Sequence, residues 1–209
     1  RSSCYSKVVE GLTIGRRMSS VYKEKIGNFK IKIKEDLTPQ NPREEWDNCG
    51  TMVCAHRRYE LGDKQFRTPE EIDDELSAND RNNAVVKLPL YLYDHSGITM
   101  STTPFSCPWD SGQVGFIYMN KEKILKETGG KNLTKKRKEQ ALKWLKGEVE
   151  TYDSYLRGAV YGFVIEEKKD DEWVEIDACW GFYGNYEEGA LKEARDIVKR
   201  LMETTKEVV

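Results

Sequence analysis

The sequence has only two histidines, His56 and His95, and its five cysteines are an odd number without tight pair spacing. This pattern argues against a disulfide framework and favours a reducing compartment. Structural zinc sites usually bring paired ligands two to four residues apart, and here only Cys54 and His56 lie that close. The residues available for such a site are Cys49, Cys54, His56, His95, Cys107 and Cys179. Because a free cysteine commonly packs as a small apolar side chain, we expect no metal.

Long apolar runs are also missing, and so is a glycine-rich phosphate loop. No stretch approaches the roughly 20 apolar residues that span a bilayer, and the N-terminus lacks the apolar region of a signal peptide. We therefore expect a cytoplasmic protein without a membrane partner and without a cofactor. Met18 is a candidate natural start, which leaves three alternatives for residues 1–17: a tag, an extension, or part of a longer chain.

Charge is abundant but unevenly distributed. The net charge is −2, yet ten Lys or Arg face three Glu between Lys121 and Lys146, and Glu166–Asp177 is acidic. A basic face can attract nucleic acid, although a pI near 5.9 is lower than that of dedicated nucleic-acid-binding domains. The charge pattern predicts a dipolar surface.

The least charged long segment, Leu88–Tyr118, organises the chain. Aliphatic and aromatic residues alternate over Leu88–Tyr93, and alternation resumes from Val114 to Tyr118. Between these strands lie two turns rich in Asp, Ser and Gly, at Asp94–Gly97 and Cys107–Gly112. The segment predicts strands joined by turns that carry polar side chains, where functional groups often lie.

Strands and helices follow one another without strict β-α-β alternation. We expect strands over 29–34 and 51–56, a capped helix from Pro69, a longer helix from Thr134 to Leu156, a hairpin over 161–178 and a last helix over 187–203. The fold class is α+β, with a single mostly antiparallel sheet built from hairpins and helices packed on one face. We expect residues 1–27 to form an arm or extension and 28–209 a single domain.

Three kinds of site compete for the polar residues. Catalysis would use Cys107 as nucleophile with His95 as base and Asp94 or Asp110 as orienting group. No spacing matches a hydrolase signature, and Asp in such turns is usually structural, which also weakens a carboxylate mechanism that adds Asp47.

Recognition is the second kind of site. Exposed aromatic residues beside charges suit a binding surface, here made of Trp46, Asp47, Asn48, His95, Trp109 and Asp110. The alternative is that the tryptophans close the core. A nucleic-acid site, the third kind, would use the basic helix over 131–146 through Lys135, Lys136, Arg137 and Lys138, although such helices are more often solvated faces.

Four phrases carry a resemblance to a known family: NPREEWDNCGTMVCAHRRYELGD from Asn41, LPLYLYDHSGITMSTTPFSCPWDSGQVGFIY from Leu88, EVETYDSYLRGAVYGF from Glu148 and DACWGFYGNY from Asp177. Over roughly Phe29 to Ile197 the chain resembles uncharacterised proteins encoded by bacteriophages, prophages and other mobile elements. The family pattern has an apolar residue in place of Cys49, and the resemblance brings no known activity, fold or cofactor.

The resemblance implies an accessory protein that acts on a host factor by binding, including as an inhibitor of host defence. Two alternatives stay open. One is a small hydrolase or nucleotide-modifying enzyme that uses His95, Cys107, Asp94 and Asp110, and the other is a nucleic-acid-binding protein that uses the basic helix.

Overall fold

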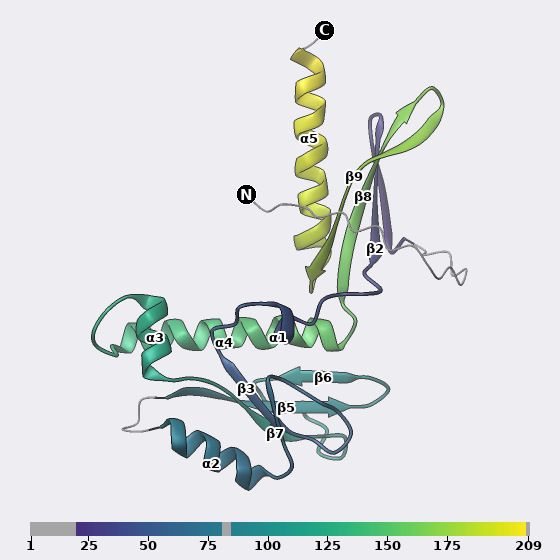
Figure 1. Cartoon of the computed structure of the whole chain (residues 1–209). Coiled ribbons are helices and arrows are strands. Elements are labelled where there is room, and N and C mark those ends of the chain that lie inside the picture. Colours follow the sequence, from purple (N-terminus) through teal and green to yellow (C-terminus); the bar gives the residue numbers. More distant parts are fainter. Residues whose placement is uncertain (1–19, 81–84, 208–209) are drawn as a thin grey trace. The chain divides into compact units, whose positions relative to one another are not determined.

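The chain divides into two compact units in the computed structural model, which describes residues 20–80 and 85–207. We call Arg1–Pro39 together with Gly158–Val209 unit 1, and Gln40–Arg157 unit 2. Unit 2 is therefore inserted, in sequence, between the two segments of unit 1 (Figure 1). This division differs from the expected single domain over 28–209, because apolar alternation predicts strands but not which strands share a core.

Unit 1 is a four-stranded antiparallel sheet with helices on one face. Its strands are β1 (Tyr22–Ile26), β2 (Phe29–Glu35), β8 (Val160–Lys169) and β9 (Glu172–Tyr183), in the order β1-β2-β8-β9. A π-helical turn, η1 (Glu187–Leu191), leads into α5 (Lys192–Glu207). Apolar residues of η1 and α5 pack on alternate residues of β2 and β8, and the core holds Phe29, Ile31, Ile33, Phe163, Ile165, Ala190, Leu191, Ala194 and Val198.

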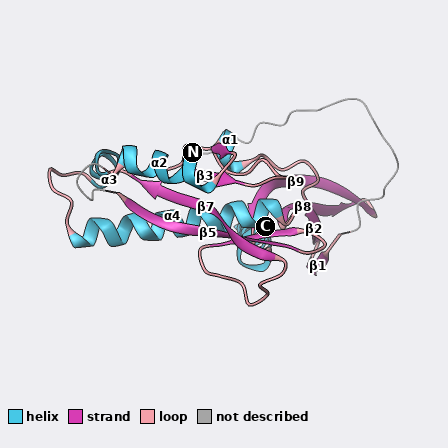
Figure 2. Ribbon diagram, turned by 90° about the horizontal axis from the view of Figure 1, so that it is seen from below, coloured by secondary structure: helices cyan, strands magenta, loops and turns pink. Residues whose placement is uncertain are grey.

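Unit 2 contains a five-stranded mixed sheet in the order β4-β3-β7-β5-β6. The strands are β3 (Thr51–Ala55), β4 (Lys64–Phe66), β5 (Val86–Asp94), β6 (Ile98–Ser101) and β7 (Ser111–Met119). β3 and β4 are parallel, and the other pairs are antiparallel. β5 and β7 run side by side at the centre (Figure 2). This central pair is the segment that the sequence predicted as strands joined by polar turns.

Helices cover both faces of the unit 2 sheet. The helices are α1 (Pro42–Glu45), α2 (Pro69–Asn79), α3 (Lys121–Thr128) and α4 (Lys135–Leu156). Ala141, Leu145 and Val149 of α4 join the core on one face, whereas Ile72 and Leu76 of α2 pack with Val53 and Tyr118 on the other. The two helices lie on opposite sides of the strands (Figure 1). Among the described helices, none combines the length and apolar character needed to cross a membrane.

The α+β class is confirmed, whereas the single, mostly antiparallel sheet is wrong. The hairpin predicted over 161–178 pairs with β2 and not with the central segment, so the strands form two sheets. The prediction that helices pack on only one face of the sheet is confirmed for unit 1. It is wrong for unit 2, where α4 and α2 cover opposite faces. Within the predicted arm, Tyr22–Ile26 forms β1, while residues 1–19 lie outside the described part of the chain.

Candidate binding cleft

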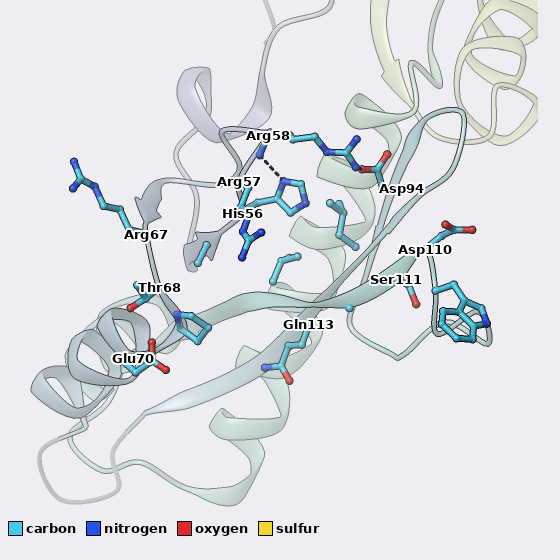
Figure 3. Close-up of a pocket in the computed structure, with 16 residues that line it drawn as sticks. His56, Arg57, Arg58, Arg67, Thr68, Glu70, Asp94, Asp110, Ser111 and Gln113 are labelled. Atoms are coloured by element: carbon cyan, nitrogen blue, oxygen red, sulfur yellow. Dashed lines mark hydrogen bonds and ion pairs between the residues drawn. The ribbon is translucent and has the colours of Figure 1, made fainter.

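A cleft of unit 2, with a volume of about 780 Å³, lies where β3 and β5 end and β7 begins (Figure 3). The antiparallel register places Tyr93 opposite Ser111, and β3 pairs with β7 through Cys54 and Gly115. The loop after β3 and the start of α2 complete the lining. Its polar side chains are His56, Arg57, Arg58, Arg67, Thr68, Glu70, Asp94, Asp110, Ser111 and Gln113, and Trp109 also contributes to the lining.

The two polar turns predicted from the sequence meet at this cleft. The amide of Asp94 donates to the carbonyl of Asp110 at 2.8 Å, and the amide of His95 donates to the carbonyl of Gly97 at 3.0 Å. The Ser111 hydroxyl donates to the carbonyl of Cys107, which closes the 107–111 loop. These bonds hold a short, well-constrained loop that presents Trp109 with 91% of its surface exposed.

Asp110 joins two of the proposed catalytic residues. Its Oδ2 lies 3.2 Å from Nδ1 of His95 and accepts a weak hydrogen bond from the Cys107 thiol at 3.7 Å. The carboxylate thus stands between thiol and imidazole, instead of the imidazole standing between nucleophile and carboxylate. A thiol is best activated by a base that contacts it directly, so this order departs from the usual cysteine-histidine arrangement.

Asp94 is used differently from the sequence-based hypothesis. Its Oδ2 pairs with the Arg58 guanidinium, and its Oδ1 accepts from the Tyr59 hydroxyl at 3.2 Å. Asp94 therefore holds the loop after β3, and its carboxylate is not directed at His95 or Cys107.

His56 anchors the same loop from inside. Its Nδ1 accepts the amides of Arg58 at 3.3 Å and Tyr59 at 3.2 Å, and its ring stacks on Tyr59 with centroids 5.0 Å apart. Burial, followed by the positive charge of Arg58, lowers the pKa of His56. The ring is consequently neutral at neutral pH, which suits its role as an acceptor for two amides.

The cysteines of the metal hypothesis are dispersed. Cys54 is fully buried in the core of unit 2, and burial raises its thiol pKa to about 12, with Asp63 adding to the effect. The described residues include no group of three or more His, Cys, Asp or Glu arranged to hold a metal ion. Cys54 and His56, the closest pair in sequence, do not share a strand, because β3 ends at Ala55 and His56 enters the loop.

The residues predicted as one binding surface lie at two ends of the unit 2 sheet. Trp46, Asp47 and Asn48 precede β3, at the end where β7 finishes, because Thr51 pairs with Tyr118. His95, Trp109 and Asp110 lie at the opposite end. Asn48 is also structural, since its side chain donates to the carbonyls of Pro42 at 2.7 Å and Trp46 at 2.9 Å.

The basic helix exists as α4, and its four predicted cations differ in their contacts. The Arg137 guanidinium donates to the carbonyls of Gly129 at 2.7 Å and Asn132 at 3.0 Å, and so fastens the loop before the helix. Lys135 lies 3.9 Å from Glu139, whereas Lys136 is exposed and Lys138 is half-buried.

Sequence reasoning missed the arginines of the cleft. Figure 3 shows Arg57 turned into the cleft and Arg67 turned away from it. The one sequence feature that could have indicated a cationic cleft is the adjacent pair Arg57 and Arg58, directly after a short predicted strand. Their role could not be assigned because the start of α2 and the Asp94 turn are brought to them only by the fold.

Comparison of the chain with protein-family models, with curated proteins and with solved structures gave no match.

Proposed function

We propose that the chain is an intracellular accessory protein of a phage or mobile element, and that it binds a host protein through the cleft end of unit 2. The observation that carries this proposal is Trp109, 91% exposed on a loop whose backbone is closed by hydrogen bonds. The resemblance to phage and prophage proteins supports the host as the source of the partner, including a component of host defence.

Trp109 suits the role of an anchor on energetic grounds. A tryptophan buries roughly 150–250 Å² in an interface and often dominates its binding energy. The loop is already ordered by the bonds between Asp94 and Asp110 and between Ser111 and Cys107, so little conformational entropy is lost when a partner covers it.

Charged side chains around the anchor provide specificity. Arg58 and Asp94 pair at the rim, His95 and Asp110 pair beside Trp109, and Arg57 points into the cleft (Figure 3). Such a mixed polar rim around an aromatic residue is typical of protein interfaces, where the charges fix the orientation of the partner.

The proposal is tested with tagged wild-type, Trp109→Ala and Trp46→Ala proteins, which capture partners from a nuclease-treated bacterial lysate. Trp46 is a matched control, since it is 43% exposed at the other end of the sheet. We expect a protein captured by the wild type and by Trp46→Ala, with affinity for Trp109→Ala reduced by about 2 kcal/mol or more. Equal capture by all three, or no protein captured by the wild type, would contradict the proposal.

A second candidate function, a small hydrolase or nucleotide-modifying enzyme, rests on Asp110 contacting both His95 and Cys107. The carboxylate would then accept the thiol proton. If the protein is such an enzyme, Cys107→Ala abolishes conversion of its substrate, while the capture of any protein from the lysate is unchanged. Under the binding proposal, Cys107→Ala retains the biological effect and Trp109→Ala loses it.

A further inference from the structure

The face of the unit 1 sheet opposite α5 is rich in lysine. Phe29, Ile31 and Ile33 of β2 point toward α5 and η1, so the alternate residues of β2 point to the other face. The register continues this face onto β1, with Lys23 opposite Lys32 and Lys25 opposite Lys30. We call it the lysine face and define it by Lys23, Lys25, Lys30, Lys32, Lys34, Trp173 and Trp180, together with two carboxylates that the register places on it, Glu166 and Glu175.

The lysines of this face are only partly neutralised. Glu166 of β8 pairs with Lys32 and lies 3.6 Å from Lys30. Within the described part of the chain, no ion pair involves Lys23, Lys25 or Lys34. The three lysines of β2 repeat at roughly 7 Å along the strand. Lys30 and Lys32 share Glu166 and keep 25% of their side chains exposed, so among the described residues the cations without a carboxylate partner that the face offers to a negatively charged chain are Lys23, Lys25 and Lys34.

Two tryptophans of β9 border the lysines. Trp180 lies against Gly162 of β8 so closely that a Cβ on the glycine would come within 2.2 Å of the indole. Gly162 thus lets the ring lie on the strand, and 41% of Trp180 stays exposed. Because Gly162 pairs with Lys34, the indole lies over the residue that is opposite Lys34 in the sheet. Trp173 is engaged by two lysines, since Nζ of Lys30 is 3.7 Å and Nζ of Lys25 is 5.6 Å from the ring centroid.

We propose that the lysine face binds single-stranded nucleic acid, with phosphates on the lysines of β1 and β2 and a base stacked on Trp180. Positively charged surfaces combined with aromatic platforms are typical of single-strand binding, because every base has a face that can stack. An acidic polypeptide would use the lysines but not the exposed indole, and a duplex keeps its bases stacked internally. This site goes beyond the proposed function, which concerns the cleft of unit 2.

The test uses the full chain and a fluorescent single-stranded oligothymidylate, with binding followed by anisotropy over a range of salt concentrations. The double variant Lys23→Glu/Lys25→Glu should weaken binding at least tenfold. The plot of log affinity against log salt should lose about 0.7 of slope for each phosphate contact removed. Trp180→Ala should weaken binding by about tenfold, as expected for one stacking contact.

A matched control is Lys192→Glu/Lys199→Glu, which makes the same charge change on exposed residues of α5, on the other side of the same unit. Oligonucleotide binding should stay within twofold of wild type, and circular dichroism should be unchanged in all variants. The proposal is overturned if the wild type does not bind, if the α5 variant loses binding equally, or if Lys135→Glu/Lys136→Glu alone abolishes it. Competition by polyglutamate as effective as by unlabelled oligothymidylate would also overturn it.

Discussion

At the scale of single residues, Arg43 is the most consequential side chain of unit 2. It is buried, with 1% of its side chain exposed, and it forms a two-pronged contact with Asp63, a bond of 2.7 Å to Glu148 and one of 2.9 Å to the carbonyl of Gly50. Replacement by methionine would leave two carboxylates facing each other without their cation. We expect Arg43→Met to lower the free energy of unfolding of unit 2 by about 3–5 kcal/mol, measured by urea denaturation.

Arg157→Met is a suitable control for this prediction. Arg157 pairs with Asp153 at 2.9 Å but is 47% exposed, so we expect a loss of about 1 kcal/mol or less. Similar midpoints for the two variants would show that the Arg43 cluster does not stabilise unit 2.

Prediction from sequence succeeds for residues whose partners are local. Thr68 caps α2 by accepting from the amide of Glu71, as the Thr-Pro-Glu-Glu pattern indicated. The partners of Arg43 lie 20 and 105 positions away, and no spacing rule reaches them. The same limit applies to the cleft: the sequence indicates the Asp110 turn and offers Asp94 or Asp110 as the partner of His95, but the choice of Asp110 and the distance of this turn from Trp46 depend on strand register.

At the scale of elements, α2 is fastened to its sheet by one carboxylate. Oε1 of Glu75 accepts from Lys64 Nζ at 2.6 Å and from the Tyr118 hydroxyl at 3.0 Å. The hydrogen bond from Lys64 lowers the pKa of Glu75, with burial opposing it and Tyr118 adding to it. Because the folded pKa is below the unfolded value of about 4.3, the stabilisation is present above that pH and is lost as pH falls through the folded value.

We therefore expect Glu75→Gln to unfold at lower urea concentration than wild type at neutral pH, and the gap to narrow as the pH falls from the unfolded pKa through the lowered folded pKa of Glu75. Asp74→Asn, an exposed carboxylate on the same helix, should have little effect at either pH. A gap between wild type and Glu75→Gln that persists unchanged in acid would contradict the role given to the ionised carboxylate.

Element identity was largely predictable, whereas element pairing was not. The apolar stripe of Ala141, Leu145, Val149 and Tyr152 predicts α4, which passes through Gly147 without a break because tertiary packing outweighs the local propensity cost. β4 was missed, since its three residues lack a pattern and it exists through parallel pairing with β3.

At the scale of the whole molecule, unit 2 is an insertion between two paired strands. Glu35 pairs with Tyr161, and the amide of Asp36 donates to the carbonyl of Val160 at 2.8 Å. The chain therefore leaves unit 1 and returns to it at adjacent positions of two paired strands. We expect the segment 40–157 to fold alone, with dispersed amide signals in nuclear magnetic resonance. Unit 1 should also fold when a short turn replaces that segment. If either piece is unfolded when it is produced alone, the two units depend on each other for folding.

The insertion also has a consequence for synthesis. β2 leaves the ribosome long before its partner strand β8, because Lys32 and Glu166 are 134 positions apart in the sequence. Until β8 is synthesised, the edge of β2 that will pair with it has no partner strand. Unpaired edges promote aggregation, and lysines are the residues that most often prevent it. Lys30, Lys32 and Lys34 of β2 are placed to provide this protection while the edge is unpaired. Their replacement by threonine should lower the soluble yield during expression more than it lowers the stability of the finished protein.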